Sequence, residues 1–155
     1  MFAHLLIPHP SYVFGPNGEY IFDQNDIFGP ETDYPLGDTT DLTGYPNAIN
    51  FIDKEMLVIV DQIIANSKTP PIIIIQGDHG SFRYNTQAQR MTILNAYYLP
   101  GIHAPLYPTI TPVNTFRIIF DSYFGQDYPL LKDASWYSPA NDHYNYELVP
   151  NECGK

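Results

Sequence analysis

Two residues that could bind a metal ion stand side by side in the tetrapeptide Gly-Asp-His-Gly at residues 77–80. Asp78 offers a hard carboxylate oxygen and His79 an imidazole nitrogen, and both groups suit a divalent cation. The flanking glycines allow the backbone to turn sharply and leave space for a ligand. The tetrapeptide is therefore a candidate metal site. A second interpretation stays open, in which Asp78 caps a loop and His79 is hydrogen-bonded beside it.

The element that must position this tetrapeptide is the run of four isoleucines at residues 72–75. Apolar residues without alternation are typical of a strand covered on both faces, as in the centre of a parallel sheet. In such a sheet, ligands bind beyond the carboxyl ends of the strands, which is where the tetrapeptide lies. We therefore expect an α/β fold with a mostly parallel sheet flanked by helices, in a single domain over residues 1–155.

Further elements are predicted around this strand. A helix over residues 46–67 carries an apolar stripe at spacings of three and four, and Pro70 and Pro71 follow its end. Residues 2–7 and 93–99 have the apolar character of strands. The stretch 23–45 is acidic, rich in Gly, Pro and Thr, and lacks a period, which predicts a long loop. The stripe of the helix consists of Ile49, Ile52, Met56, Ile59, Val60, Ile63 and Ile64.

A second helix is predicted after the last of these strands. Thr111 suits its N-cap, Pro112 its first turn, and Gly125 the position just past its end. The residues after Tyr128 show no strong period. The core face expected for this helix is Val113, Phe116, Ile119, Phe120 and Tyr123.

The composition limits the possible partners. Lys and Arg total 7 against 17 Asp and Glu, a formal charge of −10. Such a chain repels phosphate backbones and anionic lipid heads, so we expect no nucleic-acid partner, although a bound metal can still attract an anionic substrate. The single cysteine, Cys153, excludes an internal disulfide and a cysteine-rich zinc cluster. No run of about 18 apolar residues occurs, so no membrane span is expected in this chain.

The order of these motifs resembles the metal-binding segment of sulfatase-like hydrolases in the alkaline phosphatase superfamily. The resemblance rests on the helix, the Pro-Pro break, the isoleucine strand and the tetrapeptide. It also rests on residues 2–10, a strand followed by Pro-His-Pro, and on residues 111–117 (Thr-Pro-Val-Asn-Thr-Phe-Arg). It spans residues 2–130 and implies an alkaline-phosphatase-like fold, present here as the C-terminal portion of the full domain.

The resemblance implies roles for four residues. Asp78 and His79 would ligate one divalent metal ion, with Mn²⁺ or Zn²⁺ favoured by the imidazole and Ca²⁺ or Mg²⁺ also compatible. His9 would face an anionic ester, binding one of its oxygens or protonating the leaving group. A surface histidine pinned between prolines is the alternative for His9. His4 is a weaker candidate for substrate binding, because a histidine within a strand is more often a satisfied core residue.

The function implied is metal-dependent hydrolysis or transfer of a sulfate or phosphate ester. Family members carry a Thr, Ser or modified Cys nucleophile on an earlier strand, which would precede Phe2, so we expect this chain alone to lack turnover. The alternative is a non-catalytic sulfatase-like subunit or interaction domain, with the N-terminal half or other subunits as partners. A third option uses residues 23–45 as a binding loop. Relatives held outside the cytoplasmic membrane suggest an extracytoplasmic location.

Two arginines follow the tetrapeptide in a polar stretch. Either Arg83 or Arg90 could bind an anionic group through its guanidinium fork, but solvated surface positions are the favoured expectation for both. His103 and His143 lie in loop-like surroundings and are likewise expected to be exposed.

Overall fold

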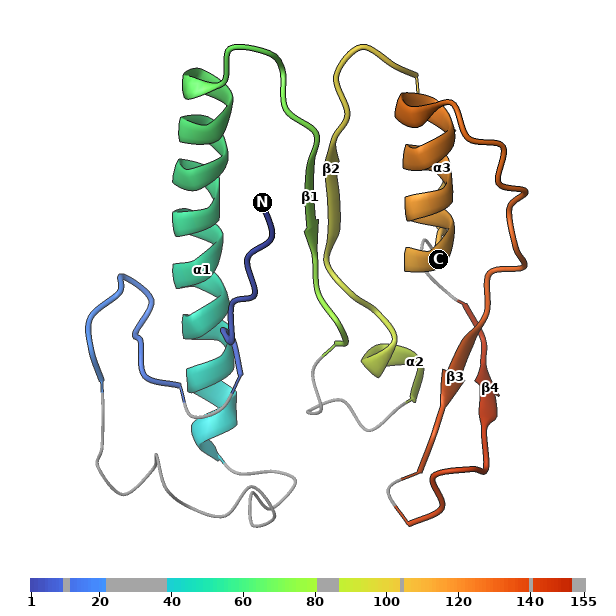
Figure 1. The fold of residues 1–155 in the computed structure, drawn as a ribbon. Helices are drawn as coiled ribbons and strands as arrows, with labels where there is room; N and C mark the ends of the chain where they lie inside the picture. Colours follow the sequence, from blue (N-terminus) through green and yellow to red (C-terminus); the bar gives the residue numbers. More distant parts are fainter. Residues whose placement is uncertain (10–11, 22–38, 81–86, 104, 140, 152–155) are drawn as a thin grey trace. The chain divides into compact units, whose positions relative to one another are not determined.

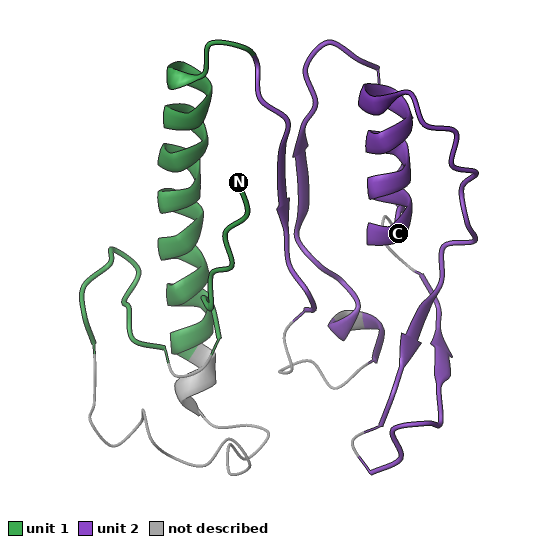
Figure 2. Cartoon of the chain, in the orientation of Figure 1, with its two compact units in different colours: residues 1–69 green, residues 70–155 purple. Residues whose placement is uncertain are grey.

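The computed structural model describes residues 1–9, 12–21, 39–80, 87–103, 105–139 and 141–151 (Figure 1). The chain divides into two compact units, Met1–Thr69 and Pro70–Lys155 (Figure 2), and each is described by itself. None of the helices in the described part of the chain combines the length and the apolar character needed to cross a membrane.

The first unit is built on α1, a helix over Thr39–Asn66. The expected start at residue 46 is corrected, because the helix begins seven residues earlier, inside the stretch predicted to be a loop. Pro46 therefore lies within the helix, where it lacks the N–H that would bond to the preceding turn. The predicted end at residue 67 is confirmed to within one residue, since α1 ends at Asn66. The remainder of the expected acidic loop, residues 23–38, lies outside the described residues.

The faces of α1 largely follow the predicted stripe. The stripe residues are half-buried except Ile59, which is 40 % exposed, while Asp53 and Asp61 are exposed as expected. Ala48 is fully buried near the start of the helix. The apolar period of three and four thus predicted this face correctly, because the helix geometry alone decides which residues share it.

A tight turn before α1 is held against the helix. The Gly18 amide donates to the Gly15 carbonyl oxygen (3.0 Å), and the Phe14 ring lies 4.9 Å from that of Phe51. The Lys54 ammonium donates to the Pro16 carbonyl oxygen at 2.8 Å. Gly18 has a φ of 81°, in the left-handed region that favours glycine.

The prediction of a strand at residues 2–7 was wrong, because these residues form no strand in the structure. Residues 1–6 are exposed, and the one bridge near them joins Phe14 to Tyr20. An apolar run becomes a strand only when a neighbouring strand accepts its backbone hydrogen bonds. In the described part of the chain, residues 2–7 have no such neighbour.

The second unit begins with β1 (Ile73–Gln76), which pairs antiparallel with β2 (Asn95–Tyr98). Both strands were predicted, but the mostly parallel sheet flanked by helices was wrong. The described strands form two antiparallel two-stranded sheets, β1–β2 and β3–β4. An unbroken isoleucine run indicates that both faces of a strand are apolar. It does not indicate whether the neighbouring strand is parallel or antiparallel.

The helix α3 (Pro112–Phe124) confirms the predicted boundaries. Thr111 occupies the N-cap position, and Gly125 ends the helix with a φ of 63°. Its predicted core face is confirmed for Ile119, which is buried, but wrong for Val113, Phe116 and Phe120, which are exposed. The other buried residues of the helix are Asn114, Thr115 and Ile118.

A polar network explains why the less apolar face of α3 points inward. Asn114, which is fully buried, accepts a hydrogen bond from the Leu131 amide at 2.9 Å and donates to the Leu131 carbonyl oxygen at 2.8 Å. The Asp133 carboxylate accepts from the Thr111 amide at 2.7 Å and from the Thr111 hydroxyl at 2.6 Å. Tyr107 donates to the same carboxylate at 2.6 Å. These bonds satisfy buried polar groups that would otherwise oppose burial of this face.

The second unit ends in a hairpin that the sequence did not predict. The strand β3 (Ser135–Tyr137) pairs antiparallel with β4 (Glu147–Val149). Thr115 on α3 contacts β2, where its hydroxyl lies 2.7 Å from the Tyr97 hydroxyl. The apolar core of the described residues is small and consists of Ala48 in the first unit and Ile118, Ile119 and Val149 in the second.

Candidate metal-binding turn

The predicted metal-binding residues lie in the turn that follows β1. The ladder of β1 and β2 continues one residue past the strand, because the Gly77 amide donates to the Leu94 carbonyl oxygen at 2.9 Å. Asp78 and His79 are therefore the first residues beyond the last backbone bond of the pair. Their place at the end of the isoleucine strand confirms the local expectation, although the strand belongs to an antiparallel pair.

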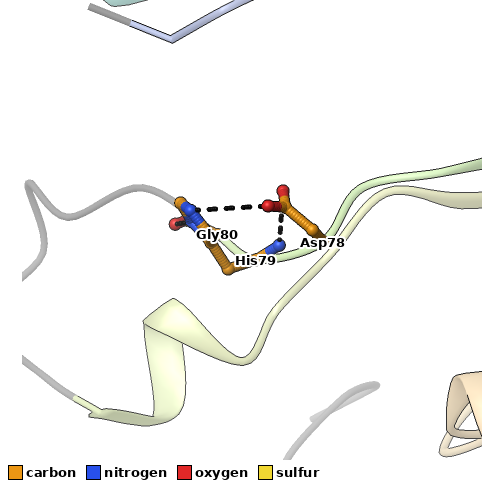
Figure 3. Close-up of polar contacts among 3 residues, drawn as sticks. All are labelled: Asp78, His79 and Gly80. Atoms are coloured by element: carbon orange, nitrogen blue, oxygen red, sulfur yellow. Dashed lines mark hydrogen bonds and ion pairs between the residues drawn. The ribbon is translucent and has the colours of Figure 1, made fainter. Parts of the chain in front are cut away.

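The side chains of Asp78 and His79 turn toward each other (Figure 3). His79 Nε2 lies 3.8 Å from Asp78 Oδ2, and the His79 amide donates to Asp78 Oδ1 at 3.0 Å. The side chain of Asp78 is 87 % exposed and that of His79 is 34 % exposed. Both groups can therefore be reached from solvent, and neither is sealed in packed hydrocarbon.

The backbone of the turn selects the tautomer of His79. Its Nδ1 lies 2.7 Å from the Gly80 carbonyl oxygen, and a carbonyl oxygen can only accept. Nδ1 is therefore the protonated nitrogen of the neutral ring, and the lone pair is on Nε2, the nitrogen that faces Asp78. Metal-binding histidines are commonly oriented in this way by a backbone carbonyl.

The donor set fits a divalent ion, but only in part. Ligand atoms lie about 2.0–2.2 Å from such an ion, so two of them on one ion are about 3–4 Å apart. The 3.8 Å between His79 Nε2 and Asp78 Oδ2 falls within this range. The part of the chain that the structure describes holds no group of three or more His, Cys, Asp or Glu residues arranged to bind a metal. Catalytic sites take three protein ligands or more, so this pair would be one portion of a site.

Arg90 lies next to the turn, which sequence reasoning did not anticipate. It is the last residue of α2 (Gln87–Arg90), and its carbonyl oxygen accepts a hydrogen bond from the Gly80 amide at 2.6 Å. Arg90 is half-buried, where a solvated surface position was expected. Burial lowers the pKa of Arg90, while the nearby Tyr137 and Asp78 act to raise it. Arg83, the other arginine considered, lies outside the described residues.

The two other predicted site histidines belong to the first unit. His9 is exposed at the end of a turn in which its amide donates to the Leu6 carbonyl oxygen at 3.1 Å. His4 is exposed in a segment without regular secondary structure, so the expectation of a buried, satisfied histidine there was wrong. Both belong to Met1–Thr69, whereas Asp78 and His79 belong to Pro70–Lys155. The roles predicted for His9 and His4 stay predictions.

The remaining candidates fall into two groups. His103 and His143 are exposed, as expected. Cys153 lies outside the described residues. The polar network around Asn114 and Asp133 was missed, and the one signal for it in the sequence is the pair of polar residues Asn114 and Thr115 in the first turns of the helix.

Comparison with known proteins adds no family to this picture. None of the protein-family models matches the chain, and neither the curated proteins nor the solved structures include a significant match.

Proposed function

We propose that Asp78 and His79 are two ligands of a divalent metal ion in a site for hydrolysis or transfer of a sulfate or phosphate ester. The observation that carries this proposal is the turn after β1, where His79 Nε2 and Asp78 Oδ2 lie 3.8 Å apart. The Gly80 carbonyl oxygen supports it, because it holds the His79 proton on the other ring nitrogen. The resemblance of residues 2–130 to sulfatase-like hydrolases supplies the substrate class.

The residues of this chain would have different roles in such a site. A bound divalent ion would supply a positive charge that polarises the ester and stabilises the oxyanion. Asp78 would contribute a negative charge that favours binding of the ion, and His79 a neutral nitrogen ligand. The role predicted for His9, binding an ester oxygen or protonating the leaving alcohol, stays a prediction, because His9 belongs to the other compact unit. The nucleophile and the further ligands that turnover needs are not among these residues, so this proposal concerns a part of a larger site.

The metal-binding half of this proposal gives a direct prediction. The double variant Asp78→Ala, His79→Ala is expected to bind Mn²⁺ or Zn²⁺ at least about tenfold more weakly than the wild type, because it removes both ligands. Isothermal titration calorimetry of the full chain with each metal at pH 7 measures the difference.

A matched control exists within the same chain. Asp142 and His143 form a second Asp-His pair, and both are exposed in a loop of the same unit. The variant Asp142→Ala, His143→Ala should keep the wild-type affinity. Equal affinities in the wild type and the Asp78–His79 variant, or an equal loss in both double variants, would contradict the metal site.

An interaction domain within a larger assembly is the second candidate function. The observation that favours it is the outward face of α3, whose apolar residues follow one another at spacings of three and four. These residues are Val113, Phe116, Phe120 and Phe124, with exposed fractions of 48, 42, 43 and 59 %. An apolar helix face of this kind is typical of a surface that a partner covers.

Light scattering coupled to size-exclusion chromatography tests the second candidate. A chain whose α3 face requires a partner is expected to associate when it is alone, and Phe116→Ser should shift the population toward the monomer. The circular dichroism spectrum of the variant should match that of the wild type. The chain should be loaded at about 100 μM, a concentration at which even an association with a micromolar Kd is nearly complete. A wild-type chain that still elutes as a folded monomer would count against this candidate.

A further inference from the structure

One face of the β3–β4 hairpin, residues 135–149, turns large side chains to solvent. Trp136 lies opposite Leu148 in the register of the two strands, so the two side chains share a face. Side chains alternate between the faces of a strand, which places Tyr146, the residue directly before β4, on the same side. The exposed fractions of Trp136, Tyr146 and Leu148 are 56, 59 and 52 %. These three residues are called the hairpin face below.

The opposite side of the hairpin is engaged with its own unit. Val149 is 2 % exposed, and Tyr137, which pairs with Glu147, is half-buried. Glu147 Oε2 accepts a hydrogen bond from Gln87 Nε2 of α2 at 2.7 Å. The hairpin is therefore held to the second unit by one side, and it presents the hairpin face to solvent.

The charges around the hairpin face favour a cationic ligand. Residues 135–149 include Asp142 and Glu147 but no lysine or arginine, and the whole chain carries a net charge of −10. Asp142 is exposed in the loop between the two strands, where Tyr144 is 89 % exposed. Such a field attracts cations and repels anions. The faces of Trp and Tyr rings also attract cations, with Trp the strongest. The aromatic rings and the carboxylates thus select the same sign of ligand.

We propose that the hairpin face binds an arginine-rich basic segment of a protein partner. Guanidinium groups would lie on the rings of Trp136 and Tyr146, because a planar cation gains both electrostatic attraction and stacking there. Leu148 would contact the aliphatic stem of an arginine side chain. Asp142 would attract a further cation of the same segment. This proposal depends neither on the metal site nor on the apolar face of α3.

Two other ligands could use exposed aromatic rings, a neutral sugar and the interface of a zwitterionic membrane. Both would need the rings but not the negative charge, so their binding should change little with ionic strength. A basic segment needs both features, and salt screens the attraction between exposed charges. Ionic strength therefore separates the proposed ligand from the other two.

The experiment uses the fluorescence of Trp136, which is the single tryptophan of the chain and therefore reports on the hairpin face. The full chain is titrated with a synthetic peptide that alternates arginine and glycine, and with a matched peptide that alternates glutamate and glycine. We expect a saturable change in emission with the arginine peptide alone. Raising the salt from about 0.05 M to about 0.5 M should weaken the binding severalfold.

Substitutions on the hairpin face test which residues bind the peptide. Tyr146→Leu keeps an apolar side chain without the ring, and it should weaken the arginine peptide by about threefold to tenfold, the range for a lost cation–π contact. Trp136→Leu, measured by calorimetry because it removes the fluorophore, should lose at least as much. Phe2→Leu removes a 91 % exposed ring from the first unit and should leave binding unchanged. Circular dichroism spectra of the three variants should match that of the wild type.

Several results would overturn the proposal. They are an absence of binding by the arginine peptide, an equal response to the glutamate peptide, and binding that added salt does not weaken. Unchanged affinity in both Tyr146→Leu and Trp136→Leu, or an equal loss in Phe2→Leu, would also overturn it. Maltoheptaose and phosphatidylcholine vesicles test the two other ligands, and a stronger response to either than to the arginine peptide assigns the hairpin face to a sugar or a membrane instead.

Discussion

Replacing Asn114 with alanine is expected to lower the free energy of unfolding by about 2–4 kcal/mol, the range for a buried polar group whose partners lose their hydrogen bonds. Asn114 is fully buried, and its amide bonds both the N–H and the C=O of Leu131. Its Nδ2 also donates to Asp133 Oδ1 at 3.0 Å. Alanine would remove these bonds, together with the one that Asn114 Nδ2 donates to the Tyr107 hydroxyl at 3.1 Å, and leave a cavity between α3 and the segment that leads to β3. Urea unfolding of the full chain, followed by circular dichroism, measures the loss.

A control on the same helix makes the result specific. Ser122 is exposed on α3, and Ser122→Ala should change the free energy of unfolding by no more than about 0.5 kcal/mol. Asn114→Asp keeps the shape but places a second carboxylate beside Asp133, so it should destabilise strongly at pH 7 and less at pH 4. Little loss of stability in Asn114→Ala would show that water replaces the amide and that the network does not hold this segment.

The second large effect concerns Asp133 and pH. Desolvation raises the pKa of its carboxyl group, but hydrogen bonds from Thr111, Tyr107 and Asn114 outweigh it, and the pKa lies below the ordinary value. The carboxylate is thus favoured in the folded state. Its contribution is fully present above the pKa of the unfolded chain, about 3.9 for an aspartate. It is lost as the pH falls from there through the lower pKa of the folded state.

Asp133→Ala is therefore expected to cost about 2–4 kcal/mol at pH 7, because four donors to one charged group lose their acceptor. The difference from the wild type should narrow as the pH falls below about 4. Urea midpoints at pH 7, 4 and 3 measure this trend. Asp142→Ala, at an exposed position whose hydrogen bonds with Pro139 and Asn145 use only backbone atoms, should show no comparable difference. If the stability difference between Asp133→Ala and the wild type is the same at all three pH values, the stabilising role assigned to the ionised Asp133 carboxylate is contradicted.

The sequence predicted elements whose signals are local. Thr111, Pro112 and Gly125 mark the limits of α3 because capping depends on residues within one turn. The apolar stripe of α1 and the existence of β1 and β2 were predictable for the same reason. The adjacency of Asp78 and His79 at the end of β1 required only that the isoleucine run be a strand.

Features that depend on distant partners could not be predicted. The inward face of α3 is set by Asp133, which lies 19 residues beyond Asn114, and no period within the helix contains that information. The direction of β2 relative to β1 depends on the path of the connecting chain. The strands β3 and β4 have three residues each, and they form because they pair with each other, with Trp136 opposite Leu148. Arg90 joined the candidate site through one backbone bond that spans ten residues.

The small apolar core has a thermodynamic consequence. The heat capacity change and the denaturant m-value of unfolding both scale with the surface that unfolding newly exposes. Only Ala48, Ile118, Ile119 and Val149 are buried apolar side chains among the described residues, and large residues such as Phe124 and Trp136 already meet water in the folded chain. Unfolding therefore uncovers less additional hydrocarbon than it would in a chain of this length with a large core, so we expect the stability curve to be flatter with temperature, and the denaturation transition broader, than the length would suggest.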